Sequence, residues 1–283
     1  VFDLASYSCY LADYDKIPAI IHEIGIRREE SFREVGEGTG TSIDLDKYDK
    51  YYKHLFLWDN DKQKLVGAYR LGFGKDIMER YGKDGFYTES LFHFSKYATG
   101  HLSQCIELGR SFVALEYKKE ALPLMLLLRG LLLSVVKYPE YKYLIGPVSI
   151  SSSYPKFYIS LMYYYILKKH STHDIRRNFK SRTPFKPDYL RVSPEDLLGT
   201  KMATVETFDR FLLRLSDQQY RLPTLVKQYL KLGAQIACFN VDKDFNFSVD
   251  GLVFLKLSDV PKDEIAQLAK GMENQDEIYS RFG

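Results

Sequence analysis

Hydrophobic residues recur along this chain in two periods, one typical of helices and the other typical of strands. Ile20, Ile21 and Ile24 share one face of a helix, so we predict a helix over 16–34. The glycine-rich stretch 36–40 comes directly after it and predicts a loop.

Short apolar runs elsewhere predict strands, and longer runs of helical period predict further helices. The predicted strands cover 53–59, 64–71, 105–113, 143–151, 235–241 and 251–257. The predicted helices cover 119–137, 155–169 and 222–232. This order of elements predicts a mixed α/β (α+β) fold, in which helices flank a twisted, mixed sheet.

Composition and charge exclude several classes of protein. The 283 residues are 45% hydrophobic and 27% charged, which is typical of a globular protein. A net charge of +3 is too small to indicate nucleic-acid binding. The longest apolar run, Leu122–Val136, is too short to span a bilayer and predicts a buried helix. Cys9, Cys105 and Cys238 lie far apart, so we expect no zinc site, no disulfide and a cytoplasmic location.

Three aspartates follow the glycine-rich loop with the spacing Asp44-x-Asp46-x-x-Asp49. In an extended segment, Asp44 and Asp46 point to the same side. Carboxylates so close together repel one another unless they are solvated, paired with cations or bound to a cationic ligand. The sequence leaves open whether this segment is a solvated turn or a binding site.

Charged residues also interrupt two of the apolar strands. Arg70 ends one of them, whereas Glu107 and Arg110, followed by Ser111, lie inside another. Charges within a buried strand are costly unless they are paired. We therefore expect Glu107 and Arg110 to form either a structural ion pair or part of a catalytic site.

Taken in order, these clusters resemble the ornithine and glycine N-acyltransferases of bacterial aminolipid synthesis, some of which are labelled hemolysins. The resemblance to the acyl-homoserine-lactone autoinducer synthases is more distant, because they carry serine at Gly109 and glutamate at Asp44. The matching pieces extend from about Glu23 to about Val260. They are Arg28-x-x-x-Phe32, Asp44-x-Asp46-x-x-Asp49, His54-Leu55, Gly67-Ala68-Tyr69-Arg70, Tyr87-x-Glu89, Glu107-Leu108-Gly109-Arg110-Ser111, Gly146–Ser151, Pro223-x-Leu225-x-Lys227-x-Tyr229 and Asp242-x-Asp244-Phe245-Asn246.

The resemblance implies a Gcn5-related (GNAT-like) fold and transfer of a fatty acyl group to the amine of a small amino acid. We expect an N-acyltransferase core at 1–186 and, at 187–283, a C-terminal extension that completes this domain or packs on it. The implied acceptor is glycine or ornithine. The implied donor is a long-chain acyl group, with or without a 3-hydroxyl, on the 4′-phosphopantetheine arm of acyl carrier protein. No bound cofactor is expected.

One absence bears on the donor. Coenzyme A-dependent members of this fold class usually hold the pyrophosphate on a glycine-rich turn at a helix N-terminus. Here the strand ending at Val113 continues into Ala114–Glu120 without a glycine. This favours acyl carrier protein, and an acyl-coenzyme A-dependent acetyltransferase is the alternative enzyme. A non-enzymatic, membrane-active hemolysin-like module is the other alternative, and the sequence offers it no spanning segment.

The reaction requires a general base, because an ammonium group must lose a proton before it can attack. His54, which titrates near neutral pH, and Glu107 are the candidates, and Arg110 completes the predicted catalytic residues. Backbone N–H groups around Ser111 are candidates for stabilising the oxyanion.

Asp46 and Asp49 are expected to hold the acceptor's ammonium group, and Arg70 or Arg110 its carboxylate through two hydrogen bonds. Arg28 and Phe32 are expected to shape the entrance for the acyl arm, unless they simply pack against the glycine-rich loop. The full set of predicted substrate-binding residues is Asp44, Asp46, Asp49, Arg70, Arg28, Phe32 and Ser111.

The segment Lys168–Lys186 contains seven Lys or Arg residues against one Asp. Such a segment attracts an acidic carrier protein or an anionic membrane surface, which would place the protein peripherally at the inner membrane. A solvated basic loop is the alternative.

Overall fold

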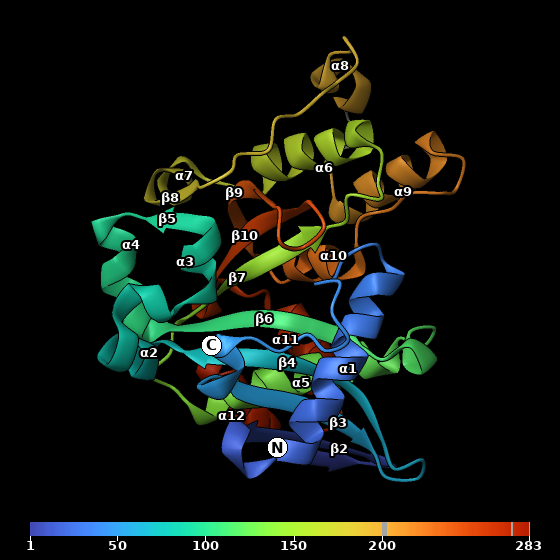
Figure 1. Ribbon diagram of the computed structural model, residues 1–283. Helices are drawn as coiled ribbons and strands as arrows, with labels where there is room; N and C mark the ends of the chain where they lie inside the picture. The colour runs from blue at the N-terminus through green and yellow to red at the C-terminus, as the bar shows by residue number, and fades with distance from the viewer. Residues whose placement is uncertain (200–202, 273, 283) are drawn as a thin grey trace.

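The computed structural model describes residues 1–199, 203–272 and 274–282. Its central feature is an eight-stranded sheet in the order β1-β2-β3-β4-β6-β7-β10-β9 (Figure 1). These strands are β1 Phe2–Leu4, β2 Tyr7–Asp13, β3 Lys53–Asp59, β4 Lys64–Phe73, β6 Cys105–Val113, β7 Tyr143–Ile150, β9 Gln235–Asp242 and β10 Ser248–Lys256. A small second sheet pairs β5 (Phe92–Phe94) with β8 (Phe179–Ser181).

In the part of the chain that the structure describes, the pairing of β6 with β7 is the one parallel contact of the large sheet, and it is short. It extends from Cys105 opposite Tyr143 to Glu107 opposite Ile145, although β6 continues to Val113 and β7 to Ile150. The pairing stops at Glu107. In Figure 1, β6 and β7 are seen to diverge. Gly146 lies where they part, and a β-carbon there would stand only 2.1 Å from the carbonyl oxygen of Leu108. Only glycine permits this approach.

Helices cover both faces of the sheet. On one face α1 (Pro18–Glu34) crosses β4 and β6, and on the other α5 (Leu122–Lys137) packs against β2, β3 and β4 (Figure 1). The remaining helices are α2 Gly74–Tyr81, α3 Tyr87–Leu91, α4 Lys96–His101, α6 Lys156–Lys169, α7 His173–Asn178, α8 Pro194–Leu198, α9 Val205–Leu215, α10 Thr224–Lys231, α11 Lys262–Ala269 and α12 Gln275–Phe282. None of the helices in the described ranges is both long and apolar enough to cross a bilayer.

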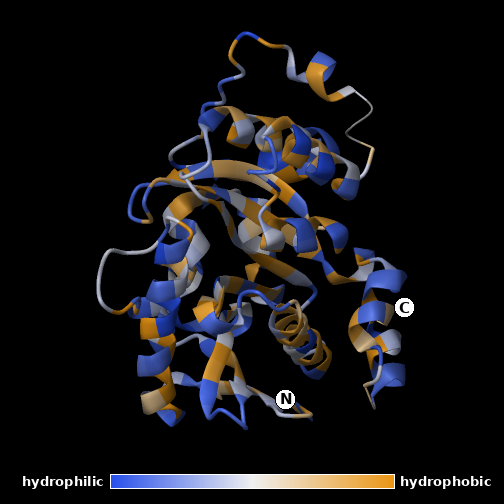
Figure 2. Cartoon of the chain, turned by 90° about the vertical axis from the view of Figure 1, so that its right-hand side faces the viewer, coloured by the Kyte–Doolittle hydropathy of each residue, from blue (hydrophilic) through white to orange (hydrophobic). Residues whose placement is uncertain are grey.

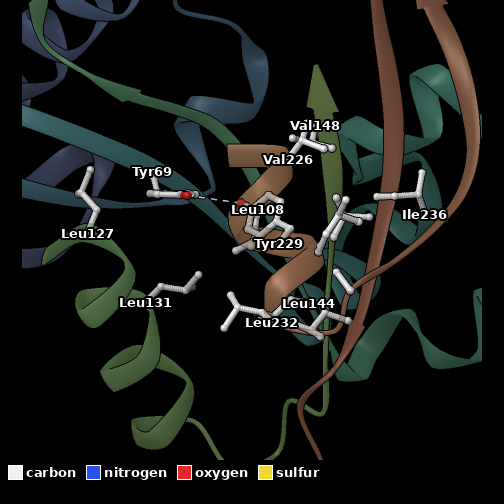
Figure 3. Packing of buried hydrophobic residues seen from close by; sticks show 14 of the residues in the cluster. Tyr69, Leu108, Leu127, Leu131, Leu144, Val148, Val226, Tyr229, Leu232 and Ile236 are labelled. Carbon is white, nitrogen blue, oxygen red and sulfur yellow. Dashed lines mark hydrogen bonds between the residues drawn. The ribbon is translucent and has the colours of Figure 1, made fainter. Parts of the chain in front are cut away.

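The largest core lies on the α5 face, where apolar side chains of the strands meet those of the helices. Hydrophobic residues are frequent along the strands of the sheet (Figure 2). Tyr229 of α10 packs there with Leu108 of β6 and Val148 of β7, and its hydroxyl is 3.4 Å from that of Tyr69 (Figure 3). Helix α10 therefore packs behind the diverging strands. Burying each large apolar side chain contributes roughly 1.5–3 kcal/mol, which fixes this arrangement.

The periodicity predicted the long elements within a few residues of their observed bounds. The helix predicted over 16–34 is α1, and the strand predicted over 105–113 is β6. The strand predicted over 251–257 begins earlier, at Ser248. Its pairing with β7, from Val249 opposite Ile150 to Lys256 opposite Tyr143, places the C-terminal strands in the same sheet. The predicted division at residue 186 stays a prediction.

Candidate active site

On the α1 face, the middle of the sheet carries charged residues in place of apolar ones. His54 of β3 is opposite Arg70 of β4, which is in turn opposite Gly109 of β6. Directly paired residues share a face, and so do residues two apart on a strand, so Glu107 lies on this face as well. The sheet thus brings together, from three strands, four positions that were predicted to belong to the site or lie next to it.

The three aspartates of the predicted cluster pair with three arginines. Arg28 of α1 makes a two-bond contact with Asp49, with N–O distances of 3.1 and 3.0 Å, and its Nε is 3.0 Å from Asp44. Arg70 Nη1 lies 2.6 Å from Asp46 and 3.1 Å from Asp49. Arg110 Nε lies 3.2 Å from Asp44. The positive and negative charges of this network balance.

The solvated-turn interpretation is therefore wrong, because Asp44 and Asp49 are buried and paired. Burial alone would raise the pKa of Asp49, but Arg70 and Arg28 outweigh it and hold that pKa well below its usual range. The backbone also fixes the turn: Asp46 caps residues 47–50 by accepting the N–H of Tyr48 and of Asp49. The aspartates are committed to arginine, which leaves them poorly placed to hold an acceptor's ammonium group.

A cage of tyrosines surrounds Arg70. Its guanidinium carbon lies 5.6 Å from the ring centre of Tyr48, 5.3 Å from that of Tyr52 and 5.6 Å from that of Tyr87. Arg70 is 1% exposed, and its Nε and Nη2 have no hydrogen-bond partner among the described residues. A buried guanidinium with free donors in an aromatic cage is suited to binding a planar carboxylate.

Glu107 does not pair with Arg110, so the expected ion pair between them is wrong. The Glu107 carboxylate accepts the N–H of Tyr87 at 3.0 Å and of Thr88 at 2.6 Å, together with a hydrogen bond from the Tyr52 hydroxyl. Burial raises the pKa of Glu107 in spite of these hydrogen bonds. Its oxygens anchor the start of α3, which positions Tyr87 over the site.

Arg110 occupies a break in the register of β6. Its φ of 49° is in the left-handed region, and the pairing with β4 shifts between Ala68 and Arg70. The guanidinium lies 4.7 Å from the ring centre of Phe245, and its Nη1 is 3.3 Å from the Tyr87 hydroxyl. This bulge turns the arginine into the space where β6 and β7 part.

Comparisons with known proteins assign a family to this arrangement. Residues 27–128 match the family model described as an acetyltransferase (GNAT) domain. The glycine N(alpha)-acyltransferase of Bacteroides thetaiotaomicron is 33% identical over 255 residues, which cover 84% of this chain and 73% of that protein. The glycine N(alpha)-acyltransferase of Phocaeicola vulgatus is 30% identical over 254 residues, covering 84% and 76%. The chain belongs to this N-acyltransferase family.

Among solved structures, the AHL synthase LasI aligns with 50% of this N-acyltransferase and 72% of its own chain, at 12% identity and a TM-score of 0.34. The family model and the curated relatives confirm the expected GNAT-type fold and N-acyltransferase activity. These relatives are named as enzymes, so they give no support to the non-enzymatic alternative.

The other predicted residues of this N-acyltransferase take less central positions. His54 is 1% exposed and its Nε2 is 3.0 Å from the carbonyl oxygen of Asp49. Burial lowers the pKa of His54, so it is neutral at pH 7. The Ser111 side chain hydrogen-bonds Tyr69, away from the arginines. Phe32 packs edge-on against Phe245 at 5.1 Å, beside Arg110.

The glycine-rich loop binds a carboxylate of its own chain. Glu29 of α1 accepts the N–H of Thr39 and of Gly40, each at 3.0 Å. Gly38 and Gly40 have φ values of 110° and 77°, which only glycine adopts readily. Burial would raise the pKa of Glu29, but these hydrogen bonds outweigh it and lower that pKa. The loop is therefore closed on Glu29 and is not an open phosphate cradle.

Sequence reasoning assigned no role to four residues that face the site: Tyr52, Tyr87, Glu37 and Asp250. For Asp250 a signal existed, since it adjoins an apolar run in the way that Glu107 does. The predicted strand began at Gly251, so Asp250 was left outside it, whereas β10 begins at Ser248. Tyr52 carried no distinguishing signal among 23 tyrosines, whereas Tyr87 belongs to the matching piece Tyr87-x-Glu89 but was assigned no role.

Proposed function

We propose that this enzyme acylates the α-amino group of glycine with a long-chain fatty acyl group, with or without a 3-hydroxyl, carried as a thioester. The observation that carries the proposal is the 33% identity, over 84% of the chain, to a protein named glycine N(alpha)-acyltransferase. The site supports it, because a small amino acid needs a buried cation for its carboxylate. Arg70 offers free N–H donors and is fully buried. Ornithine is the alternative acceptor.

The divergence of β6 and β7 supports binding of the thioester between these two strands. Beyond Glu107, the edge of β6 has no β7 partner, and the bulge at Arg110 interrupts its ladder. We propose that backbone N–H groups of this edge, near Ser111, stabilise the tetrahedral oxyanion. Arg110 lies at the same edge, and its positive charge would stabilise the negative charge that develops on the oxyanion.

We further propose acyl carrier protein as the donor. The turn that follows β6 continues through a 3-10 helix at Leu115–Tyr117 into α5, without a glycine or a side-chain cap at its start. The basic segment supports docking of an acidic partner, since its Lys and Arg residues are exposed. Arg182 is partly committed, at 3.0 Å from Glu89. An anionic membrane surface, such as the cytoplasmic face of an inner membrane, is the alternative partner for this segment.

The test is a mass-spectrometric assay of the purified protein with one fatty acyl group on either acyl carrier protein or coenzyme A, and with glycine. N-acylglycine formed from the carrier protein but not from coenzyme A supports both parts of the proposal. Turnover with acyl-coenzyme A alone contradicts the donor. The Arg70→Ala variant should lose activity through a raised KM for glycine, because its carboxylate loses its partner.

A further inference from the structure

A space inside the site is left unfilled by the protein. Gly109 is buried, yet a β-carbon built on it would have no heavy atom within 4 Å. Its neighbour across the ladder is Arg70, whose Nε and Nη2 have no hydrogen-bond partner among the described residues. Its neighbour along the strand is Arg110. A buried space between two guanidinium groups, one with free donors, is suited to a small anion-bearing ligand.

Carboxylates that the aspartate–arginine network does not use lie on the other side of Arg110. Asp250 of β10 is opposite Ser149 of β7 and Asn240 of β9, and Asp242 is opposite Ser248. These positions share the α1 face of the sheet with Arg70. The hydroxyl of Tyr87 joins the two sides: it is 3.3 Å from Arg110 Nη1 and 3.3 Å from Asp242 Oδ2.

Glu37, in the glycine-rich loop, lies near Asp250 and Arg110. The carbonyl of Gly36 accepts a hydrogen bond of 2.6 Å from Asn246, in the turn between β9 and β10. The charged groups that face Glu37 are Asp250 from β10, Arg110 from β6 and Lys118 from the turn after β6. Within the described part of the chain, its carboxylate has no hydrogen-bond partner.

Within the described residues no Lys, Arg or His forms an ion pair with these carboxylates, although Asp242 accepts a hydrogen bond from the Tyr87 hydroxyl and Asp250 one from the Ser248 hydroxyl. The pairing around Asp49, in contrast, is closed. Asp242 and Asp250 are 5% and 3% exposed. Burying such groups is costly unless they take up a proton or a cation. Burial, with the charge of Asp250, raises the pKa of Glu37 to about 8 against the opposing effect of Arg110. Burial, with the charge of Asp242, raises that of Asp250 to about 6.

We propose that Asp242, Asp250 and Glu37 form the amine subsite for the acceptor, and that Glu37 is the general base. This inference rests on the proposed function. The acceptor's carboxylate lies toward Arg70 in the space at Gly109, and its ammonium group lies toward Asp250. A zwitterionic small amino acid thus matches the positive and negative sides of the site.

The chemistry balances as follows. The ammonium group gives one proton to the Glu37 carboxylate, and the neutral amine attacks the thioester carbonyl carbon to form the C–N bond. The resulting oxyanion collapses, the C–S bond breaks, and the thiolate takes the second proton from the nitrogen. The products are the amide, the free thiol and one proton, which Glu37 releases to solvent. His54 and Glu107 take no part in this transfer, because both are held by other groups.

The test compares Glu37→Gln and Asp250→Asn with Glu34→Gln, an exposed carboxylate near the end of α1. The donor is the thioester that the wild type accepts, and glycine is varied. We expect Asp250→Asn to raise the KM for glycine at least tenfold and to leave the KM for the donor unchanged. We expect Glu37→Gln to lower kcat by roughly 10²-fold or more. In the wild type, kcat/KM should rise with pH through about 8, the pKa of Glu37, and Glu37→Gln should abolish this rise. Glu34→Gln should behave as the wild type.

The outcomes separate the two proposals. No product from the wild type with any donor or amino acid overturns the proposed function. The amine subsite is then tested by calorimetric titration with glycine and with acetate: it requires wild-type binding of glycine that Asp250→Asn weakens at least tenfold. An active wild type whose Glu37→Gln and Asp250→Asn variants keep its kcat and glycine KM overturns the amine subsite. Circular dichroism checks that each variant folds. If Glu37→Gln fails to fold, Glu37→Asp replaces it and should shift the pH dependence of kcat/KM.

Discussion

At the scale of single residues, Arg28 contributes most visibly to the site's construction. It is 1% exposed and joins Asp44, in the loop, to Asp49, in the 3-10 helix Lys47–Lys50 that follows. A lone buried charge is destabilising by several kcal/mol, whereas a closed set of pairs is tolerated. The network therefore holds the segment after the glycine-rich loop in place over β4. It also positions Arg70, which pairs with Asp46 and Asp49.

Arg28→Ala should strongly destabilise the protein, because it leaves Asp44 and Asp49 buried with less compensation. We expect a loss of roughly 3–5 kcal/mol in the free energy of unfolding, measured by urea titration. The matched control is Arg27→Ala, whose contacts to Glu23 and Glu30 lie on the surface and should cost at most about 1 kcal/mol. Equal losses in the two variants would contradict the structural role assigned to Arg28.

Asp250 should make the stability of the protein depend on pH. Its pKa is raised from 3.8 to about 6 in the folded protein, so the folded state binds the proton more tightly than the unfolded chain. The contribution of protonated Asp250 to the free energy of unfolding is therefore complete below about pH 4 and is lost as the pH rises through about 6. The shift corresponds to about 3 kcal/mol.

The Asp250→Asn variant should lack this decline, relative to the wild type, in urea titrations at pH 4 to 8 without substrate. Asp259→Asn, a change at an exposed carboxylate, should keep it. Parallel pH profiles of Asp250→Asn and wild type would show that Asp250 is ionised normally, and would remove one support of the amine subsite.

At the scale of elements, the short parallel contact of β6 and β7 decides the shape of the site. Periodicity predicted both strands, because each is rich in apolar residues. Periodicity did not predict where the two strands part. That point depends on the close approach of Gly146 to Leu108 and on the bulge at Arg110, and both arise from contacts between segments that are distant in the sequence. The short helices α2 to α4 were missed for a related reason: their residues are held by tertiary contacts, such as those of Glu107 with α3.

Two glycines test this account of the strands. In Gly146→Ala the new methyl group meets the Leu108 carbonyl oxygen, which belongs to the backbone and cannot move aside. We expect a loss of roughly 1–3 kcal/mol or more in the free energy of unfolding. Gly109→Ala places the same methyl group in open space and should change stability by less than about 1 kcal/mol. A harmless Gly146→Ala would mean that the strands approach less closely than described.

At the scale of the whole molecule, one sheet joins the N-terminal and C-terminal parts of the chain. β10 pairs with β7 along its length, and it carries Asp250 to the same face as Arg70. The sequence could indicate an extension after residue 186, but the pattern of strands alone could not show which strand it would join. The proposed amine subsite exists only because this extension lies in the sheet.

This continuity predicts a single unfolding transition. Trp58 of β3 is the one tryptophan of the chain and reports on the N-terminal half of the sheet. Its fluorescence and the far-ultraviolet circular dichroism should therefore give coincident urea transitions. Two separated transitions would indicate that 1–186 and 187–283 unfold as independent domains.

A competition assay between amino acids decides whether glycine is the acceptor. The purified protein is given a fatty acyl thioester and an equimolar mixture of amino acids in which glycine alone carries a heavy isotope, and the products are weighed by mass spectrometry. We expect one dominant product, an N-acyl amino acid with the mass of labelled N-acylglycine. An acylated ornithine, or acylation of the protein without any N-acyl amino acid, would contradict it.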